Sequence, residues 1–218
     1  MKKNIIYLIL ILFSTFLNAN EKIVLQLKWF HQFQFAGYYA AKEKGFYDEV
    51  GLNVEIRQRD LKYNNIDEVI NGNAQYGVAD SILILYRLKQ QPVVIVSPIF
   101  QHSPSVFISL KKSNISSVYE LNNKDILFYP NDTDGFSLLA MIKKFDLDVN
   151  LVRERYKDDY MRLINNEVDV MPAYIANEPF LFKEKGYDVN IINPTNYGFD
   201  MYGDMLFTNE DEAKNNPI

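Results

Sequence analysis

The sequence predicts an α/β protein, and two observations carry that prediction. Short apolar runs rich in β-branched residues alternate with amphipathic segments along most of the 218 residues. Glycine, proline, serine, asparagine or aspartate stands at many of the junctions, where helices are capped or end and strands begin. A strand-helix unit repeated in this way is typical of mostly parallel sheets.

The first half of the chain is expected to hold five strands and three helices. Residues 22–28 alternate apolar and polar side chains as a half-buried strand does. Gly45 can end a helix in the left-handed conformation, and Asn65 can cap the next helix. Pro92 forces an extended entry into 93–96, an apolar run typical of a strand buried on both faces. The expected strands are 22–28, 52–57, 76–79, 93–96 and 106–110, and the expected helices are 36–44, 66–70 and 82–89.

The second half continues the alternation. Ser116 is expected to cap a short helix that ends at Leu121, and a longer helix over 136–145 is expected to begin at one of residues 132–134. The turn-prone stretch 101–104 separates two clusters of strand-helix units and therefore suggests two lobes. The remaining expected strands are 126–129, 150–153, 168–172 and 189–192, and the remaining helices are 158–165 and 177–185.

The first 19 residues have the pattern of a secretory signal peptide. Lys2 and Lys3 precede the apolar run 5–13, and the small residue Ala19 suits the cleavage site. The run is short for a membrane span, although a retained signal anchor is the alternative interpretation. We therefore expect an exported, periplasmic protein.

Composition narrows the class of protein further. The chain has no cysteine, which excludes disulfides and thiolate metal sites and leaves the hydrophobic core to hold the fold. Without Lys2 and Lys3, 21 of the 23 basic residues remain against 28 acidic ones, a formal net charge of −7. No basic patch stands out in the sequence, so nucleic acid is not an expected partner.

Five stretches carry a family resemblance. K-W-F-H-Q-F-Q-F-A-G-Y-Y-A-A-K-E-K-G-F-Y-D-E-V-G-L-N-V-E-I (28–56) resembles the first βαβ unit of periplasmic substrate-binding proteins of the thiamine-pyrimidine synthase and alkanesulfonate-binding group. The others are G-V-A-D-S (77–81), I-F-Q-H-S-P (99–104), A-Y-I-A-N-E-P-F (173–180) and I-I-N-P-T-N-Y-G-F-D-M-Y-G-D-M-L-F-T (191–208). The resemblance implies a two-lobed type II periplasmic binding protein, with lobe 1 at 20–104, lobe 2 at 105–203, and 204–218 returning to lobe 1. Family members continue with helices where this sequence stops, so we expect the fold to be incomplete at the C-terminus.

In such folds the ligand lies beyond the carboxyl ends of parallel strands, near helix N-termini. Trp29 follows a strand and could stack on a planar ligand, with His31 as a hydrogen-bonding neighbour and Gly37 allowing close approach to the backbone. Glu178 heads a helix and could accept from the exocyclic amine of an aminopyrimidine. The expected ligand-binding residues are Trp29, His31, Phe33, Gly37, Tyr38, Asp80, Ser81, Gln101, His102, Asp132, Tyr174, Asn177, Glu178, Tyr197 and Asp200.

Each of these residues also has an ordinary structural interpretation. Trp29 could pack in the core, Asp80 and Ser81 could simply cap a helix, and Glu178 could be a favourable acid at a helix start. His102 could belong to hinge structure. Asp132 and its acidic neighbour disfavour a strongly anionic ligand at that helix start; Ca²⁺ binding there is the alternative.

The expected function is binding of a small ring-containing solute, a thiamine pyrimidine precursor, for the membrane permease of an ABC transporter. One alternative is a thiamine pyrimidine synthase that uses pyridoxal phosphate, histidine and iron. By resemblance its lysine and histidine would fall at Ala79 and Leu83, and its cysteine motif is absent, so no catalytic or metal residue and no cofactor is expected. The other alternative is a periplasmic ligand-sensing domain, fused to or partnered with a signalling module, because 99–104 and 196–208 are similar to versions fused to kinase or cyclase modules.

Overall fold

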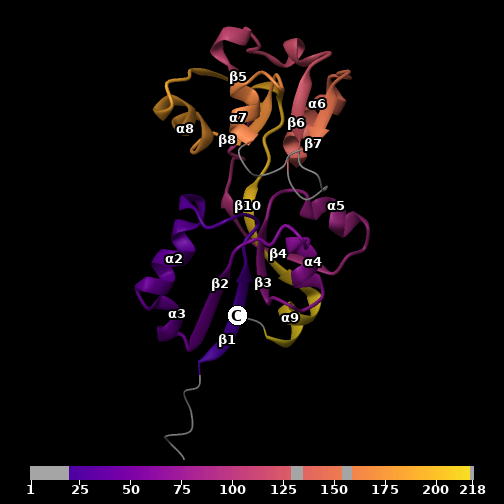
Figure 1. The fold of residues 1–218 in the computed structure, drawn as a ribbon. Coiled ribbons are helices and arrows are strands. Elements are labelled where there is room, and N and C mark those ends of the chain that lie inside the picture. The colour runs from indigo at the N-terminus through magenta and orange to yellow at the C-terminus, as the bar shows by residue number, and fades with distance from the viewer. Residues whose placement is uncertain (1–19, 129–134, 154–158, 217–218) are drawn as a thin grey trace, which may run out of the picture. The chain divides into compact units, whose positions relative to one another are not determined.

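The computed structural model describes residues 20–128, 135–153 and 159–216 (Figure 1). The expected signal peptide, Asp132 and the possible helix start at 132–134 lie outside these residues. The chain divides into two compact units, the first ending at Gly77 and the second beginning at Val78. Strands and helices alternate through both units, which confirms the predicted α/β class.

The first unit is built on parallel strands. Strand β1 (Glu21–Gln26) pairs with β2 (Leu52–Arg57) on one side and with the start of β3 (Tyr76–Ala79) on the other. Ile23, Leu25 and Leu27 are buried, as the alternation predicted. The short helix η1 (Phe33–Phe35) leads into α2 (Ala36–Glu43) and then α3 (Phe46–Glu49). Helices α2 and α3 pack against β2, whereas α4 (Asn65–Ile70) packs against β1 (Figure 1).

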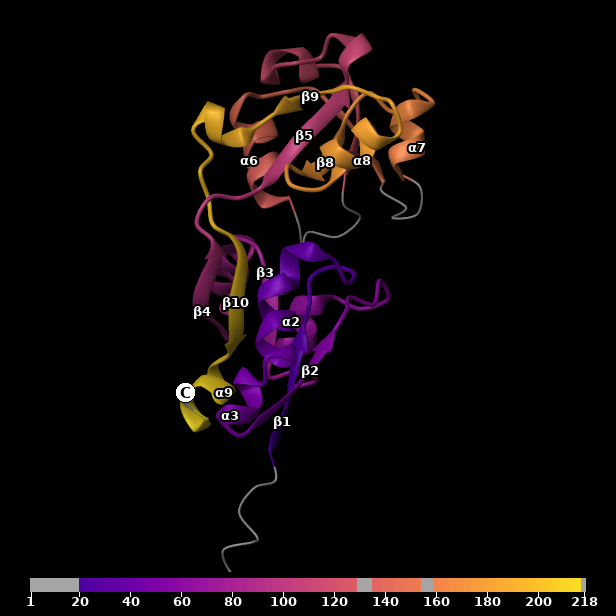
Figure 2. The same ribbon diagram turned by 90° about the vertical axis from the view of Figure 1, so that its left-hand side faces the viewer.

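Three groups of strands form the sheets of the second unit. Strand β4 (Val93–Phe100) pairs antiparallel with β10 (Gly203–Asn209), and the two run side by side in Figures 1 and 2. Strand β5 (Ser105–Leu110) lies between β8 (Met171–Tyr174) and β9 (Val189–Ile192), antiparallel to both. Strand β6 (Asp125–Phe128) pairs in parallel with β7 (Asn150–Arg153). The helices of this unit are α5 (Leu83–Leu88), η2 (Lys111–Ser113), η3 (Val118–Leu121), α6 (Phe136–Lys144), α7 (Asp159–Ile164), α8 (Glu178–Glu184), η4 (Pro194–Tyr197) and α9 (Glu210–Asn215).

Strand β5 is the centre of the second unit's core. All six of its residues are buried, and successive side chains enter different clusters because a strand turns them to opposite faces. Phe107 packs with Ile126 and Leu138, whereas Ile108 packs with Leu127 and Phe182. The two-sided burial that the sequence predicted for 93–96 is therefore found in β5.

The prediction for 93–96 itself was wrong in two ways. Ile95 is 44% exposed and Val96 is 46% exposed, so the strand is not buried on both faces. It also runs on to Phe100 through Pro98. Among the described strands β4 pairs only with β10, and proline, which lacks an N–H, is tolerated where one side of a strand has no partner.

The sheets are mixed rather than parallel throughout. The antiparallel strand β10 was not predicted, because it begins with Gly203 and Asp204 and has only a short apolar run, 205–207; Asp204 has a φ of +44°. Two predicted caps are displaced by one residue. Asn64 rather than Asn65 accepts from the amide of Ile66 at 2.9 Å, and Ser117 rather than Ser116 forms the capping box of η3. The lobe boundary at 104 stays a prediction.

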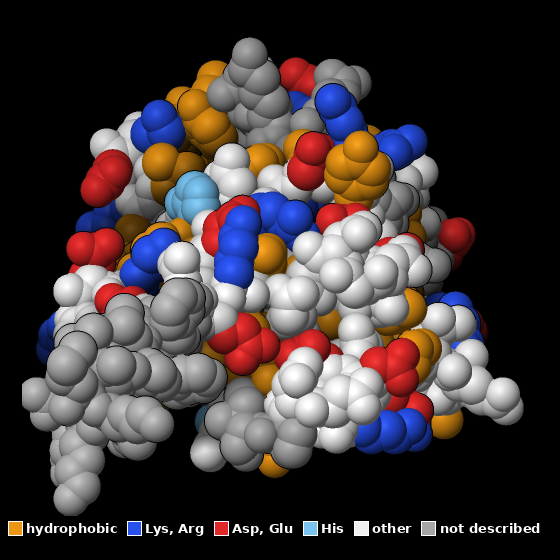
Figure 3. All heavy atoms as spheres, turned by 90° about the horizontal axis from the view of Figure 1, so that it is seen from below, with side chains coloured by type: hydrophobic (Ala, Val, Ile, Leu, Met, Phe, Trp, Pro, Cys, Tyr) orange, Lys and Arg blue, Asp and Glu red, His pale blue; other side chains and the backbone are white. Residues whose placement is uncertain are grey.

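Charges of both signs are interspersed on the surface shown in Figure 3, and neither sign forms a continuous patch there. In the described ranges, every helix is too short or too polar to cross a membrane.

Candidate functional site

A pocket of about 480 Å³ in the second unit brings together residues from three separate segments of the chain. One segment follows β3, one follows β4, and one precedes β10. Four of the predicted ligand-binding residues line it. The lining residues are Ser81, Ile84, Gln101, His102, Asp200, Met201 and Tyr202.

Two connecting segments of the chain lie side by side at this pocket. The first, 101–104, leads from β4 to β5, and the second, 198–202, leads from η4 to β10. The amide of Ser103 donates to the carbonyl of Met201 at 2.7 Å. Gly203 lets them approach, because a Cβ added there would lie 3.0 Å from Pro104 Cδ and 3.3 Å from Ser103 Cα. A larger side chain at position 203 would therefore push against the segment 103–104.

His102 and Asp200 form the polar pair of the pocket. Nδ1 of His102 lies 2.9 Å from each carboxylate oxygen of Asp200, so this nitrogen carries the proton that is donated. In the neutral ring Nε2 is then an acceptor. Both side chains are exposed, which keeps them accessible to a ligand.

Ser81 is held in place at the end of β3. Its hydroxyl donates to the carbonyl of Tyr202 at 2.6 Å, and its side chain is buried. The preceding Asp80 is also buried, and its Oδ1 accepts from the amide of Ile82 at 3.0 Å, which fixes the turn into α5. Asp80 therefore performs a structural task at the turn, while Ser81 ties this turn to the segment that carries Asp200.

The lining of the pocket favours ligands that donate hydrogen bonds. Asp200 supplies a carboxylate, Gln101 an amide and His102 an imidazole, and none of the lining residues in the described part of the chain is a lysine or arginine. A carboxylate accepts from amines and ring N–H groups and repels anions. The chemistry of this pocket thus suits a neutral or cationic, nitrogen-rich molecule.

Glu178 and its neighbours form a second polar group in the same unit. One oxygen of Glu178 accepts from the amide of Tyr174 at 2.6 Å, and the other accepts from the Nδ2 amide of Asn177 at 2.9 Å. Burial raises the pKa of Glu178, although these hydrogen bonds act to lower it. Both carboxylate oxygens thus have partners in their own loop.

The hydroxyl of Tyr174 donates to Oδ1 of Asp204 at 2.9 Å. Asp204 is only 1% exposed and was missed by the sequence reasoning, although it lies within the stretch 191–208 that carries the family resemblance. Tyr197 lies elsewhere: its hydroxyl accepts from the amide of Val118 at 3.2 Å, and its ring meets Phe145 at 5.8 Å in the core.

The other predicted residues belong to the first unit. Trp29 is partly buried and meets Phe30 edge-on with ring centroids 5.5 Å apart. His31 is exposed, and its Nδ1 is hydrogen-bonded to the hydroxyl of Tyr39. Phe33 is 91% exposed, and a Cβ at Gly37 would meet no atom within 4 Å. Tyr38 is partly buried in α2.

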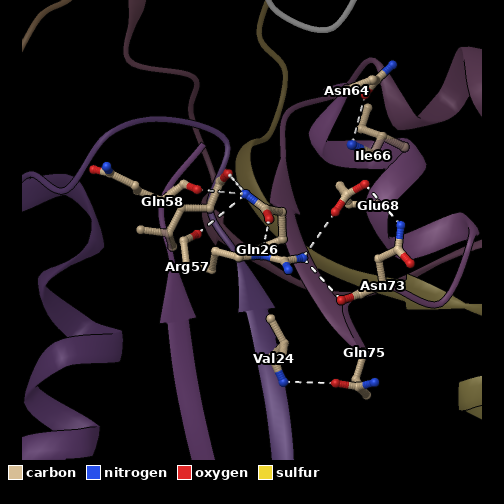
Figure 4. A network of polar contacts seen from close by, with 10 residues as sticks. Val24, Gln26, Arg57, Gln58, Asn64, Ile66, Glu68, Asn73 and Gln75 are labelled. Atoms are coloured by element: carbon tan, nitrogen blue, oxygen red, sulfur yellow. Dashed lines mark hydrogen bonds and ion pairs between the residues drawn. The ribbon is translucent and has the colours of Figure 1, made fainter. Parts of the chain in front are cut away.

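The loop that holds Trp29 rests on a polar network that the sequence reasoning missed (Figure 4). The side chain of Gln26 donates to the carbonyls of Leu27 and Gln58 at 3.0 and 3.2 Å. Nε of Arg57 donates to Gln26 Oε1 at 2.7 Å, and the guanidinium also reaches Glu68 and the carbonyl of Asn73. The polar residues near the ends of two expected strands, 22–28 and 52–57, were the sequence signal that could have predicted this network.

No cluster of three or more histidine and acidic side chains able to hold a metal ion occurs among the described residues. The possible Ca²⁺ loop at 131–135 lies almost wholly outside them.

Comparison with known proteins places these features in a family. A family model described as "NMT1/THI5 like" matches residues 32–218. The riboflavin-binding protein RibY of Chloroflexus aurantiacus is 26% identical over 184 residues, which are 79% of this chain and 51% of that protein. The formylaminopyrimidine-binding protein of Halalkalibacterium halodurans is 24% identical over 197 residues, covering 88% of this chain and 60% of that protein. The chain thus spans about half to three-fifths of these relatives.

Among solved structures, the periplasmic aliphatic sulphonate-binding protein SsuA of Escherichia coli matches with a TM-score of 0.68 and 12% identity. The match covers 90% of this chain and 67% of that structure. The similarity confirms the predicted fold of a periplasmic binding protein.

Proposed function

Because the chain belongs to the NMT1/THI5-like family, we propose that it is an exported solute-binding protein that delivers a small ring-containing molecule to the permease of an ABC-type importer. The observation that carries the proposal is the pocket in which Ser81, Gln101, His102 and Asp200 meet. These residues come from segments far apart in the sequence, and Ser81 is hydrogen-bonded to Tyr202, 121 positions away in the segment that carries Asp200.

The preferred ligand is a thiamine pyrimidine precursor that carries an exocyclic amine. A volume of about 480 Å³ accommodates a single substituted pyrimidine, and pockets for small molecules start near ~300 Å³. In this proposal Asp200 accepts from the amine, while Gln101 and His102 Nε2 hydrogen-bond the ring or its substituents. The relative that binds formylaminopyrimidine supports this choice, because its ligand belongs to the same chemical class.

Isothermal titration with 4-amino-5-hydroxymethyl-2-methylpyrimidine tests the proposal, with riboflavin and an alkanesulfonate as competitors. We expect the aminopyrimidine to bind and Asp200→Asn to weaken it by about tenfold or more, because an accepting charge is lost. The exposed Asp211 on α9 gives the matched control, and Asp211→Asn should bind as the unchanged protein does. Tight binding of the sulfonate, with the aminopyrimidine giving no heat, would contradict the ligand assignment.

A further inference from the structure

Tyr202 is an exposed aromatic residue in the wall of the pocket that contains Asp200. It lines this pocket, lies directly before β10 and is 53% exposed. Within the ranges that the structure describes, its ring makes no aromatic contact and its hydroxyl makes no hydrogen bond. An aromatic face that borders a pocket and has no partner in the described chain is available to a ligand.

The backbone around Tyr202 is fixed at three consecutive residues. The carbonyl of Tyr202 accepts from the hydroxyl of Ser81 at 2.6 Å. The carbonyl of the preceding Met201 accepts from the amide of Ser103 at 2.7 Å, and the following Gly203 begins the pairing of β10 with β4. The ring therefore projects from a segment that is already ordered, so a ligand that binds to it has only the rotation of one side chain to restrict.

Ser81 also places a second apolar side chain, that of Ile84, at the same pocket. The carbonyl of Ser81 accepts from the amide of Ile84 at 3.2 Å, in the turn that opens α5. Ile84 lines the pocket and is 49% exposed. The buried Ser81 is thus bonded to Ile84 through its carbonyl and to Tyr202 through its hydroxyl. Together Ile84 and Tyr202 give the pocket apolar surface that a ligand could remove from water.

The polar residues of the pocket do not by themselves distinguish a ring from a chain. Asp200 can accept from an aliphatic amine as well as from the amino group of a pyrimidine, and Gln101 and His102 can bond to either. The flat side chain of Tyr202 does distinguish them. A planar unsaturated ring stacks on it face to face, whereas a flexible aliphatic chain contacts it at few atoms and loses rotational freedom.

We propose that Ile84 and Tyr202 form an apolar wall that selects a flat, unsaturated ring, with Tyr202 stacking on the ring while Asp200 binds its amino group. This inference rests on the proposed function and names the residues that decide which class of amine is bound. All of them belong to the second unit. Stacking on one aromatic side chain raises affinity by about tenfold or more, so the pocket prefers aromatic heterocycles to aliphatic amines.

Isothermal titration with 4-amino-5-hydroxymethyl-2-methylpyrimidine and with 1,4-diaminobutane tests this selectivity. We expect the unchanged protein to prefer the aminopyrimidine. Tyr202→Leu should weaken aminopyrimidine binding by about tenfold, whereas Tyr202→Phe, which keeps the aromatic face, should weaken it by no more than about twofold. Diaminobutane should bind weakly and equally to all three proteins. The matched control is Tyr119→Leu, because Tyr119 is 70% exposed in the same unit but does not line the pocket.

Nitration by tetranitromethane tests the same contact in the unchanged protein, without any substitution. A saturating concentration of the aminopyrimidine should slow the nitration of Tyr202 by about threefold or more, because the bound ring covers it, and should leave the nitration of Tyr119 unchanged. Mass spectrometry of the digested protein reports each tyrosine separately. Circular dichroism and thermal melting confirm that the variants are folded; if Tyr202→Leu does not fold, the nitration measurement and Tyr202→Phe carry the test.

The outcomes separate this inference from the proposed function. Undiminished binding by Tyr202→Leu, an equal loss in Tyr202→Leu and Tyr202→Phe, or unchanged nitration of Tyr202 in the complex would overturn the inference and leave the proposed function intact. If the unchanged protein does not bind the aminopyrimidine, or binds diaminobutane more tightly, the proposed function and the inference fail together.

Discussion

At the scale of single residues, some members of the candidate site were predicted from the sequence and others were not. Ser81, Gln101, His102 and Asp200 were predicted from their places beside strand ends and in the resembling stretches, and the structure brings them into one pocket. Arg59 and Asp204 were not predicted. Both are charged residues that are almost completely buried, and burial of a charged side chain depends on partners far apart in the sequence, which periodicity does not reveal.

Glu178 gives a pH-dependent prediction. Burial raises its pKa above the ordinary value of 4.5, so the folded state holds this proton more tightly than the unfolded state. The free energy of unfolding should therefore fall as the pH rises from about 4.5 through the raised pKa, as far as this group contributes. Glu178→Gln removes this slope, so its stability relative to the unchanged protein should increase with pH in that window.

Urea unfolding at a series of pH values between 4 and 8 measures the effect of Glu178→Gln. Glu184→Gln is the matched control, because Glu184 lies on the same helix, α8, but is exposed. A stability difference between Glu178→Gln and the unchanged protein that does not vary with pH would contradict the prediction.

At the scale of elements, the strands that pair with sequence-distant partners were the hardest to predict. Strands β1, β2 and β3 were expected and found, because alternating or apolar runs and their bounding turn residues were both present. Strand β10 pairs with β4 over a separation of about a hundred residues, and its own sequence includes Gly203 and Asp204. An edge position and a central position also look alike in an apolar run, which is why the two-sided burial predicted for β4 is found in β5 instead.

Gly203 provides an element-scale prediction about the crossing connections. Gly203→Ala should destabilise the protein by about 1–3 kcal/mol, because the added Cβ meets Pro104 and the backbone of Ser103 within 3.3 Å. Thermal or urea unfolding measures this cost.

Gly37→Ala is the control for Gly203→Ala. Its Cβ would enter open space, and alanine favours the helix α2, so this variant should be unchanged or more stable by up to about 1 kcal/mol. Equal effects of the two substitutions would argue against a close approach at Gly203.

The groove between α5 and β4 allows a second prediction at this scale. A groove of about 370 Å³ is lined by Leu83, Ile84, Arg87, Leu88, Val93 and Ile95, and Leu88 is 74% exposed. Leu88→Lys together with Ile95→Lys should reduce binding of the dye ANS to the folded protein, since exposed apolar surface is lost. The double variant Leu61→Lys/Tyr63→Lys, at exposed positions of the first unit, should leave the dye signal unchanged. Equal dye binding by the unchanged protein and both double variants would contradict the prediction that this groove binds ANS.

At the scale of the whole molecule, the α/β class and the binding-protein fold followed from the sequence. The lobe boundary inferred from the turn-prone residues 101–104 stays a prediction, and the division into compact units after Gly77 is a separate observation of the structure. Compactness depends on which side chains pack together, and the large clusters around Phe107 and Ile108 both lie in the second unit.

The two compact units are expected to unfold at different urea concentrations, because their hydrophobic cores differ in size. Trp29 fluorescence reports only the first unit, whereas far-ultraviolet circular dichroism reports both. The fluorescence transition in urea should come at a lower concentration than the dichroism transition, because fewer of the described buried apolar residues lie in the first unit. Coincident transitions would show instead that the chain unfolds as one cooperative body.

The hydrogen bond between Ser103 and Met201 has a mechanical consequence. Two chain segments that are hydrogen-bonded near their midpoints resist independent rotation, because turning one of them alone would break that bond. A spectroscopic probe attached to either segment should therefore report the same motion.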